Sequence, residues 1–119
     1  MPDRDLAASL NEPVSVVKAE LFKALAHPAR IRALELLVDG ERSVSEMQPL
    51  VGIESSHLSQ QLGVLRRAGL VTTRRSGTSV VYAISNPGIV ELLGAARRVL
   101  IGSLTQTQDL LADLRAAGE

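Results

Sequence analysis

The 119-residue sequence contains no cysteine, and Phe22 and Tyr82 are its only aromatic residues. A chain without thiols cannot form disulfides, cysteine-ligated zinc or iron–sulfur centres, or a thiol redox switch. The scarcity of aromatic rings also argues against binding of single-stranded nucleic acids by base stacking. The core must therefore be built from leucine, valine, isoleucine and alanine.

Long apolar runs are also missing, because no stretch approaches the roughly 18 apolar residues that span a bilayer. The N-terminal residues lack the apolar segment of a secretory signal. We therefore expect a cytoplasmic protein without a membrane partner. The length suits one domain, and we expect a flexible tail at residues 1–12 followed by a single domain over residues 13–119.

The sequence has no excess of one charge, since 13 basic residues balance 13 acidic ones. The charges are nevertheless unevenly distributed along the chain. Residues 55–90 contain Arg66, Arg67, Arg74 and Arg75 and no acidic residue. A locally basic segment of this kind suits contact with phosphate groups, whatever the net charge of the chain.

Apolar residues recur at spacings of three and four in several segments, which predicts a mainly helical fold. We expect a first helix over residues 14–26, which His27 and Pro28 end because the residue before a proline avoids the helical conformation. A second helix follows and ends at Asp39 and Gly40, where glycine can adopt the left-handed conformation of a helix C-terminus.

Ser43 and Glu46 have the spacing of a capping box, which predicts a short third helix that ends near Gly52. A fourth helix is expected over residues 54–68, with leucines on one face and small polar residues on the other. Two helices joined by a glycine turn in this way indicate a helix-turn-helix. The alternating pattern that follows predicts a β-hairpin over residues 70–84.

The outer face of the helix over residues 54–68 is suited to reading base edges, because serine and glutamine offer donors and acceptors at short reach. The same face could be only a solvated helix surface. The arginine-bearing hairpin next to it favours DNA binding over that alternative. The candidate DNA-binding residues are Ser55, Ser56, His57, Ser59, Gln60, Arg66, Arg74, Arg75, Ser76 and Thr78.

Asn86 and Pro87 predict the start of a long last helix over residues 86–116. Its apolar residues continue from Ile89 to Leu114, further than so small a core can cover. An uncovered apolar stripe needs a partner, and the simplest partner is a second copy of the same chain. We therefore expect a homodimer.

Three segments carry a resemblance to a known family: LAHPARIRALELL, SSHLSQQLGVLRRAGLV and RRSGTSVVY. Over about residues 20–85 the chain resembles the ArsR/SmtB-type winged helix-turn-helix transcriptional regulators. The resemblance implies a mainly α fold with a small β-hairpin. It places the helix over residues 54–68 in the major groove of double-stranded DNA and the wing over residues 70–84 against the backbone or minor groove.

Many proteins of this type are repressors, and we expect this chain to repress transcription as a homodimer on an inverted-repeat operator. In such proteins the first and last helices form the dimer, so the resemblance extends the expected interface to both of these helices. The candidate dimerisation residues are Val14, Val17, Leu21, Ile89, Leu92, Leu93, Ala96, Leu100 and Leu104.

The best-known metal sites of this family are replaced in the sequence. The Cys-x-Cys positions of the soft-metal sensors match Ser43 and Ser45, and serine does not replace thiolate toward soft metals. The zinc-type site would use positions that have no metal-binding side chain here, namely Asn86, Gly88, Val99 and Gly102. Neither site is therefore carried over to this chain.

Histidine and carboxylate groups still offer a candidate site for nickel or zinc. The candidate ligands are His27 with Glu20, Asp3 or Asp5. A histidine before a proline at a helix start is more simply explained as a cap, so no cofactor is required by the sequence. A small molecule is the other open class of effector.

The sequence does not indicate an enzyme, because it has no glycine-rich phosphate loop, no HExxH motif and no nucleophile elbow. The alternative from another class is a winged-helix module that binds proteins and not DNA. Such a module would not need an arginine segment free of acidic residues, and this segment therefore favours DNA binding.

Overall fold

The computed structural model describes residues 13–117. The tail expected at residues 1–12 lies outside the described residues. The chain forms two compact units, of which the first ends at Pro87 and the second begins at Gly88. We describe the two units in turn, and the single domain expected over residues 13–119 stays a prediction.

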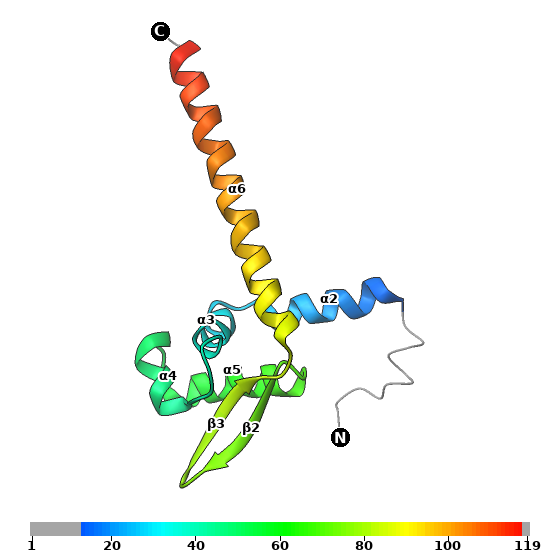
Figure 1. Cartoon of the computed structure of the whole chain (residues 1–119), viewed down its shortest axis with the longest axis vertical. Coiled ribbons are helices and arrows are strands. Elements are labelled where there is room, and N and C mark those ends of the chain that lie inside the picture. The colour runs from blue at the N-terminus through cyan, green and yellow to red at the C-terminus, as the bar shows by residue number, and fades with distance from the viewer. Residues whose placement is uncertain (1–12, 118–119) are drawn as a thin grey trace. The chain divides into compact units, whose positions relative to one another are not determined.

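The first unit contains four helices among its described residues: α2 (Val14–Leu25), α3 (Pro28–Leu37), α4 (Val44–Val51) and α5 (Ser55–Arg67) (Figure 1). The bounds of α2 and α5 lie within one residue of those that the periodicity predicts. The helices form where the sequence places apolar residues at helical spacing, and the capping residues set their ends.

Two of the predicted caps are present in the structure. The side chain of His27 accepts a hydrogen bond from the backbone N–H of Ala29, which caps α3. The capping box at the start of α4 is complete, since the Ser43 hydroxyl accepts from the Glu46 N–H and the Glu46 carboxylate accepts from the Ser43 N–H. Gly52 ends α4 in the left-handed conformation with φ of 81°.

The first unit also holds a three-stranded antiparallel sheet with the strand order β1–β3–β2. The hairpin consists of β2 (Val71–Ser76) and β3 (Ser79–Ile84), joined by a tight turn in which Gly77 has φ of 63° (Figure 1). The additional strand β1 (Arg42–Ser43) pairs with β3 and was not predicted. Two residues are too few for an alternating pattern to be visible in the sequence.

Leucines from α3 and α5, with one methionine from α4, form the centre of the core. The largest fully buried side chains are Leu34, Met47, Leu58, Leu62 and Leu65. Burial of each contributes about 1.5–3 kcal/mol relative to an exposed side chain. Because the three leucines of α5 lie on one side of the helix, its opposite side must face solvent.

The second unit is the helix α6 (Pro87–Ala117), whose first residue closes the preceding unit. In the isolated chain Ile89 is buried and Leu92 and Leu93 are half-buried. The apolar residues further along the helix are exposed, with Leu100 and Leu104 each 64% accessible. No helix among the described residues is both long and apolar enough to cross a membrane.

Candidate nucleic-acid interface

The predicted recognition face is the exposed side of α5. Its inner leucines anchor the helix to α3 and α4, and its outer side chains face solvent. The exposed residues on this side include Ser55, Ser56, His57, Ser59 and Gln60, all of which the sequence predicts as DNA-binding residues. Glu54, also exposed, precedes the helix as its N-cap residue and forms no side-chain cap hydrogen bond.

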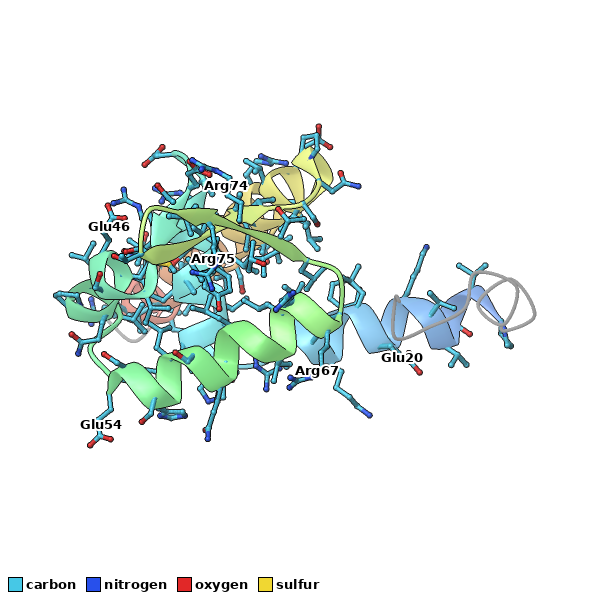
Figure 2. All side chains as sticks on the ribbon, turned by 90° about the horizontal axis from the view of Figure 1, so that it is seen from below. Glu20, Glu46, Glu54, Arg67, Arg74 and Arg75 are labelled. Atoms are coloured by element: carbon cyan, nitrogen blue, oxygen red, sulfur yellow. The ribbon has the colours of Figure 1, made fainter. Side chains whose placement is uncertain are left out.

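The hairpin lies beside α5, and Figure 2 shows Arg74 and Arg75 on opposite sides of β2, with Glu54 and Arg67 toward the two ends of α5. Alternation of side chains along a strand places neighbouring residues on opposite faces. The two arginines of the predicted pair therefore have different surroundings.

Arg74 forms an ion pair with Glu41, a residue of the segment between α3 and β1. Its Nε donates to Glu41 Oε2 at 2.8 Å, and its Nη2 pairs with Oε1 of the same carboxylate. These hydrogen bonds, together with the charge of the arginine, lower the pKa of Glu41, and they raise the pKa of Arg74. The acid that pairs with Arg74 comes from outside residues 55–90, the segment in which the sequence has no acidic residue.

Arg75 forms no salt bridge with any residue that the structure describes, and its side chain is exposed. Ser76 and Thr78 are exposed at the turn of the hairpin. Arg66 is exposed in the last turn of α5, where a cation also interacts favourably with the helix dipole. Arg75 is therefore the unpaired cation of the hairpin.

A chain of polar contacts that was not predicted connects α2, α3 and α5. The Nε of Arg30 donates to Gln61 Oε1 at 2.7 Å, and its Nη1 donates to the backbone carbonyl oxygen of Ala24 at 2.9 Å. Gln61 Nε2 lies 3.2 Å from His57 Nε2. The spacing of His57 and Gln61 by four residues was a signal available in the sequence, but the contact with Arg30 depends on the tertiary fold.

The two histidines of the chain, which are thirty residues apart in sequence, lie close together. The ring centroids of His27 and His57 are 6.1 Å apart and the rings are nearly perpendicular. The structure describes no group of three or more histidines, aspartates and glutamates that could hold a metal ion between residues 13 and 117. Asp3 and Asp5, two of the candidate ligands, lie outside the described residues.

A shallow hollow of about 310 Å³ lies beside the recognition face. It is lined by residues from the start of α4, from α5 and from β3, most of which carry hydroxyl groups. The lining residues are Ser43, Val44, Ser45, Ser59, Ser79, Val80 and Tyr82. The two helices of the helix-turn-helix, α4 and α5, and strand β3 of the wing therefore meet at one hydroxyl-rich surface.

A polar, exposed helix that is supported by a leucine core and flanked by a basic hairpin defines the winged helix-turn-helix class of proteins. A family model for the "Bacterial regulatory protein, arsR family" matches residues 27–73, which extend from the cap of α3 into β2. The chain belongs to the ArsR family of bacterial transcriptional regulators, as its sequence segments predict.

The chain is 58% identical over 109 residues to the HTH-type transcriptional regulator Rv0081 of Mycobacterium tuberculosis, a match that covers 91% of this chain and 96% of that protein. It is 43% identical over 77 residues to the biofilm growth-associated repressor of Xylella fastidiosa, covering 65% of this chain and 68% of the repressor. This chain is accordingly a transcriptional regulator and not an enzyme, as the sequence predicts.

Solved structures of relatives have the same fold. The crystal structure of Rv0081 matches with a TM-score of 0.74 and 59% identity, covering 81% of this chain and 97% of that chain. The solution structure of the homodimeric winged helix-turn-helix DNA-binding domain Mb0332 of Mycobacterium bovis matches with a TM-score of 0.66 and 32% identity, covering 82% and 86%. The predicted winged helix-turn-helix fold is confirmed.

Proposed function

We propose that the protein is a repressor that binds an inverted-repeat operator in double-stranded DNA as a homodimer. The observation that carries this proposal is the division of α5 into a buried leucine face and an exposed face of serine, histidine and glutamine. Side chains of this kind can form hydrogen bonds with base edges when a helix lies in the major groove. The repressor relative from Xylella fastidiosa supports the direction of regulation.

In this proposal the residues on the exposed face of α5 divide the task of sequence reading. Gln60 has an amide that can form two hydrogen bonds with adenine, and the short side chains of Ser56 and Ser59 allow the helix to approach the bases closely. His57 supplies a ring nitrogen on the same face. These contacts specify the sequence, whereas contacts with phosphates position the helix on the duplex.

The wing supplies the phosphate contacts. Arg75 is exposed and makes no ion pair within the described part of the chain, so it can neutralise a phosphate without breaking a contact. Arg74 would first have to exchange the carboxylate of Glu41 for a phosphate. Arg75 therefore contributes more to DNA affinity than Arg74, although they are neighbours in the sequence.

The second copy of the chain covers the apolar residues that are exposed in the isolated protomer. Val14 of α2 is 67% accessible, and Leu100, Leu104 and Leu114 of α6 are between 61% and 64% accessible. Apolar side chains exposed on this scale mark an interface. A two-fold dimer would present two copies of α5 to half-sites one helical turn apart, about 34–36 Å.

Selection of bound sequences from random double-stranded DNA would test this proposal. The proposal predicts enrichment of an inverted repeat, bound by two chains. The matched control replaces His57 and Gln60 with alanine and keeps all arginines, so it should retain only weak, sequence-independent binding. A wild-type chain that enriches no sequence, or that does not bind DNA, would instead favour a protein-interaction module.

A metal-responsive form of this function is the alternative, with Ni²⁺ or Zn²⁺ held by His27 together with Glu20, Asp3 or Asp5. The close approach of the His57 ring to that of His27 favours it, because His57 could supply a second imidazole, and imidazole is a common ligand of both metals. The cap hydrogen bond opposes it, because His27 Nδ1 accepts from the N–H of Ala29 and so carries no proton. If Nε2 bound a metal, the proton of the ring would have to lie on Nδ1, and the cap hydrogen bond would be lost.

Titration of the operator complex with Ni²⁺ and Zn²⁺ distinguishes the two forms. A metal effector should change DNA affinity by a coupling free energy of about 1–3 kcal/mol, and His27→Ala should abolish the change. If neither metal alters operator affinity, the metal-responsive form is wrong and the repressor proposal is unaffected.

A further inference from the structure

The hydrogen bonds around His57 determine which of its ring nitrogens carries the proton. A guanidinium group can only donate hydrogen bonds, so the atom of Gln61 that faces Arg30 Nε at 2.7 Å must be the amide oxygen. The amide nitrogen of Gln61 must then face His57. Because an amide NH₂ group can only donate, His57 Nε2 must accept, and the proton of the neutral ring lies on Nδ1.

The partners of Arg30 hold the amide in this orientation. Its Nη1 donates to the carbonyl oxygens of Ala24 at 2.9 Å and Lys23 at 3.4 Å, near the end of α2. These bonds hold the guanidinium, which in turn fixes the oxygen of Gln61. Gln61 is half-buried and therefore cannot rotate as freely as an exposed glutamine.

The second histidine has the opposite arrangement. His27 Nδ1 accepts a hydrogen bond from the N–H of Ala29, so the proton of its neutral ring lies on Nε2. The His27 and His57 rings also lie in a T-shaped arrangement, with 6.1 Å between centroids and an interplanar angle of 83°, which restricts the orientation of the His57 ring. The two rings thus differ in tautomer for reasons that are visible in the contacts.

We propose that Gln61, held by Arg30, is a positioning residue that locks His57 in the Nδ1–H tautomer, so that His57 presents a hydrogen-bond donor to DNA. Within the described residues Nδ1 of the exposed His57 has no hydrogen-bond partner. The donor selects an acceptor atom, which is either the N7 of a purine in the major groove or a phosphate oxygen. The tautomer stands independently of the proposed function, whereas the contact with DNA rests on it.

Nitrogen NMR of the imidazole rings in the free protein tests the proposed tautomer of His57. Correlations between ring protons and nitrogens should show the proton of His57 on Nδ1 and that of His27 on Nε2 near neutral pH. Gln61→Met preserves side-chain size and removes the amide, so the proton of His57 should shift to a mixture of both nitrogens. Gln60→Met, the matched control on the exposed face, should leave both tautomers unchanged.

Gln61→Glu provides a second test that does not depend on the stability of the methionine variant. A carboxylate still accepts from Arg30 but presents an acceptor to His57, so the proton should move to Nε2. The His27 signals report whether each variant retains the packing of α3 and α5. A proton on Nε2 of His57 in the unaltered protein, or the same tautomer in the protein and in Gln61→Glu, would overturn the proposal.

Operator binding tests whether His57 donates a hydrogen bond to DNA, once the selection experiment has supplied an operator. Replacing one purine at a time with its 7-deaza analogue, and one phosphate at a time with methylphosphonate, should lower affinity wherever a protein group contacts the replaced atom, and the position that His57 contacts should lose about two- to tenfold. The same replacement should have a smaller effect in Gln61→Met. If no position shows this dependence on Gln61, His57 does not donate to DNA, even if its tautomer is as proposed.

Discussion

Gln60 and Gln61 are neighbours of the same residue type whose roles differ because of their places on α5. Gln60 is exposed on the outer face, whereas Gln61 is half-buried and accepts a hydrogen bond from Arg30. A glutamine that is already engaged in this way cannot also form a two-bond contact with a base. Gln60, whose amide is exposed, is therefore the glutamine that we expect to read DNA.

We predict that Gln60→Ala weakens binding to the selected operator by about 1–3 kcal/mol and changes binding to random DNA very little. The physical reason is that the amide contacts base edges, which only the correct sequence presents in register. Fluorescence anisotropy with both DNAs measures the two affinities. Equal losses on the two DNAs would mean that Gln60 does not read bases.

The ion pair between Arg74 and Glu41 leads to a second prediction about a single side chain. Glu41→Gln removes the carboxylate that holds Arg74, so the arginine becomes available to a phosphate. We expect higher affinity for DNA of any sequence and a salt dependence steeper by about one unit of log–log slope per protomer.

The matched control for this change is Glu35→Gln, which removes an exposed acid of the same unit that lies 4.0 Å from Arg32. It alters the net charge equally but leaves Arg74 paired. Equal effects of the two substitutions on DNA affinity would show that net charge, and not the release of Arg74, is responsible.

At the level of helices and strands, caps and turns determine how α4 and α5 are arranged. The capping box fixes the start of α4, and Gly52 ends it with the left-handed turn that leads into α5. The buried Ser43 also belongs to β1 and pairs with Val81 of β3. One residue thus connects the helix-turn-helix with the wing.

We predict that Ser43→Ala lowers the free energy of unfolding by about 0.5–2 kcal/mol, because the N–H of Glu46 loses its acceptor. Urea denaturation measures the change. Ser45→Ala, at an exposed position of the same turn, is the control and should have a smaller effect. A loss in Ser45→Ala as large as that in Ser43→Ala would contradict the assigned role of the cap.

The capping box also predicts a pH dependence. The hydrogen bond from the backbone N–H of Ser43 lowers the pKa of Glu46 below its ordinary value of 4.5. A carboxyl group with a lowered pKa stabilises the fold above its ordinary pKa, and this contribution is lost as the pH falls through the lowered value. Urea titrations of Glu46→Gln should therefore show lower stability than the unaltered protein at neutral pH and a smaller difference in acid.

The sequence predicts most helices and the hairpin closely because their signals are local. Apolar spacing marks α5, and the serine and glutamate of the capping box mark the start of α4. The strand β1 is too short to leave a pattern. The pairings of Arg74 with Glu41 and of Arg30 with Gln61 join residues more than thirty positions apart, so only the tertiary fold brings them together.

The functional assembly that we propose is a pair of chains and not the isolated protomer. The part of α6 that carries Leu100 and Leu104 exposes these side chains to solvent in a single chain. Such a surface is stable in water only when another apolar surface covers it. The same dimer would set the distance between the two copies of α5.

We predict that the protein has about twice the mass of the 12.7 kDa chain in light scattering at micromolar concentration. Leu100→Asp combined with Leu104→Asp should produce monomers, because carboxylates would then have to be buried in the interface. Thr105→Asp combined with Gln106→Asp adds the same charge on the other side of α6 and should leave the dimer intact. A monomeric unaltered protein, or a dimer that survives the leucine substitutions, would disprove this interface.

The most direct test of the central claim compares an intact inverted repeat with a DNA of equal length in which one half-site is scrambled. Affinity and stoichiometry are measured together by anisotropy titration at physiological salt. Each mismatched base pair costs about 1–3 kcal/mol, so scrambling should weaken binding by about a hundredfold or more, with two chains bound to the intact site. Equal affinities for the two DNAs would contradict sequence-specific repression by a dimer.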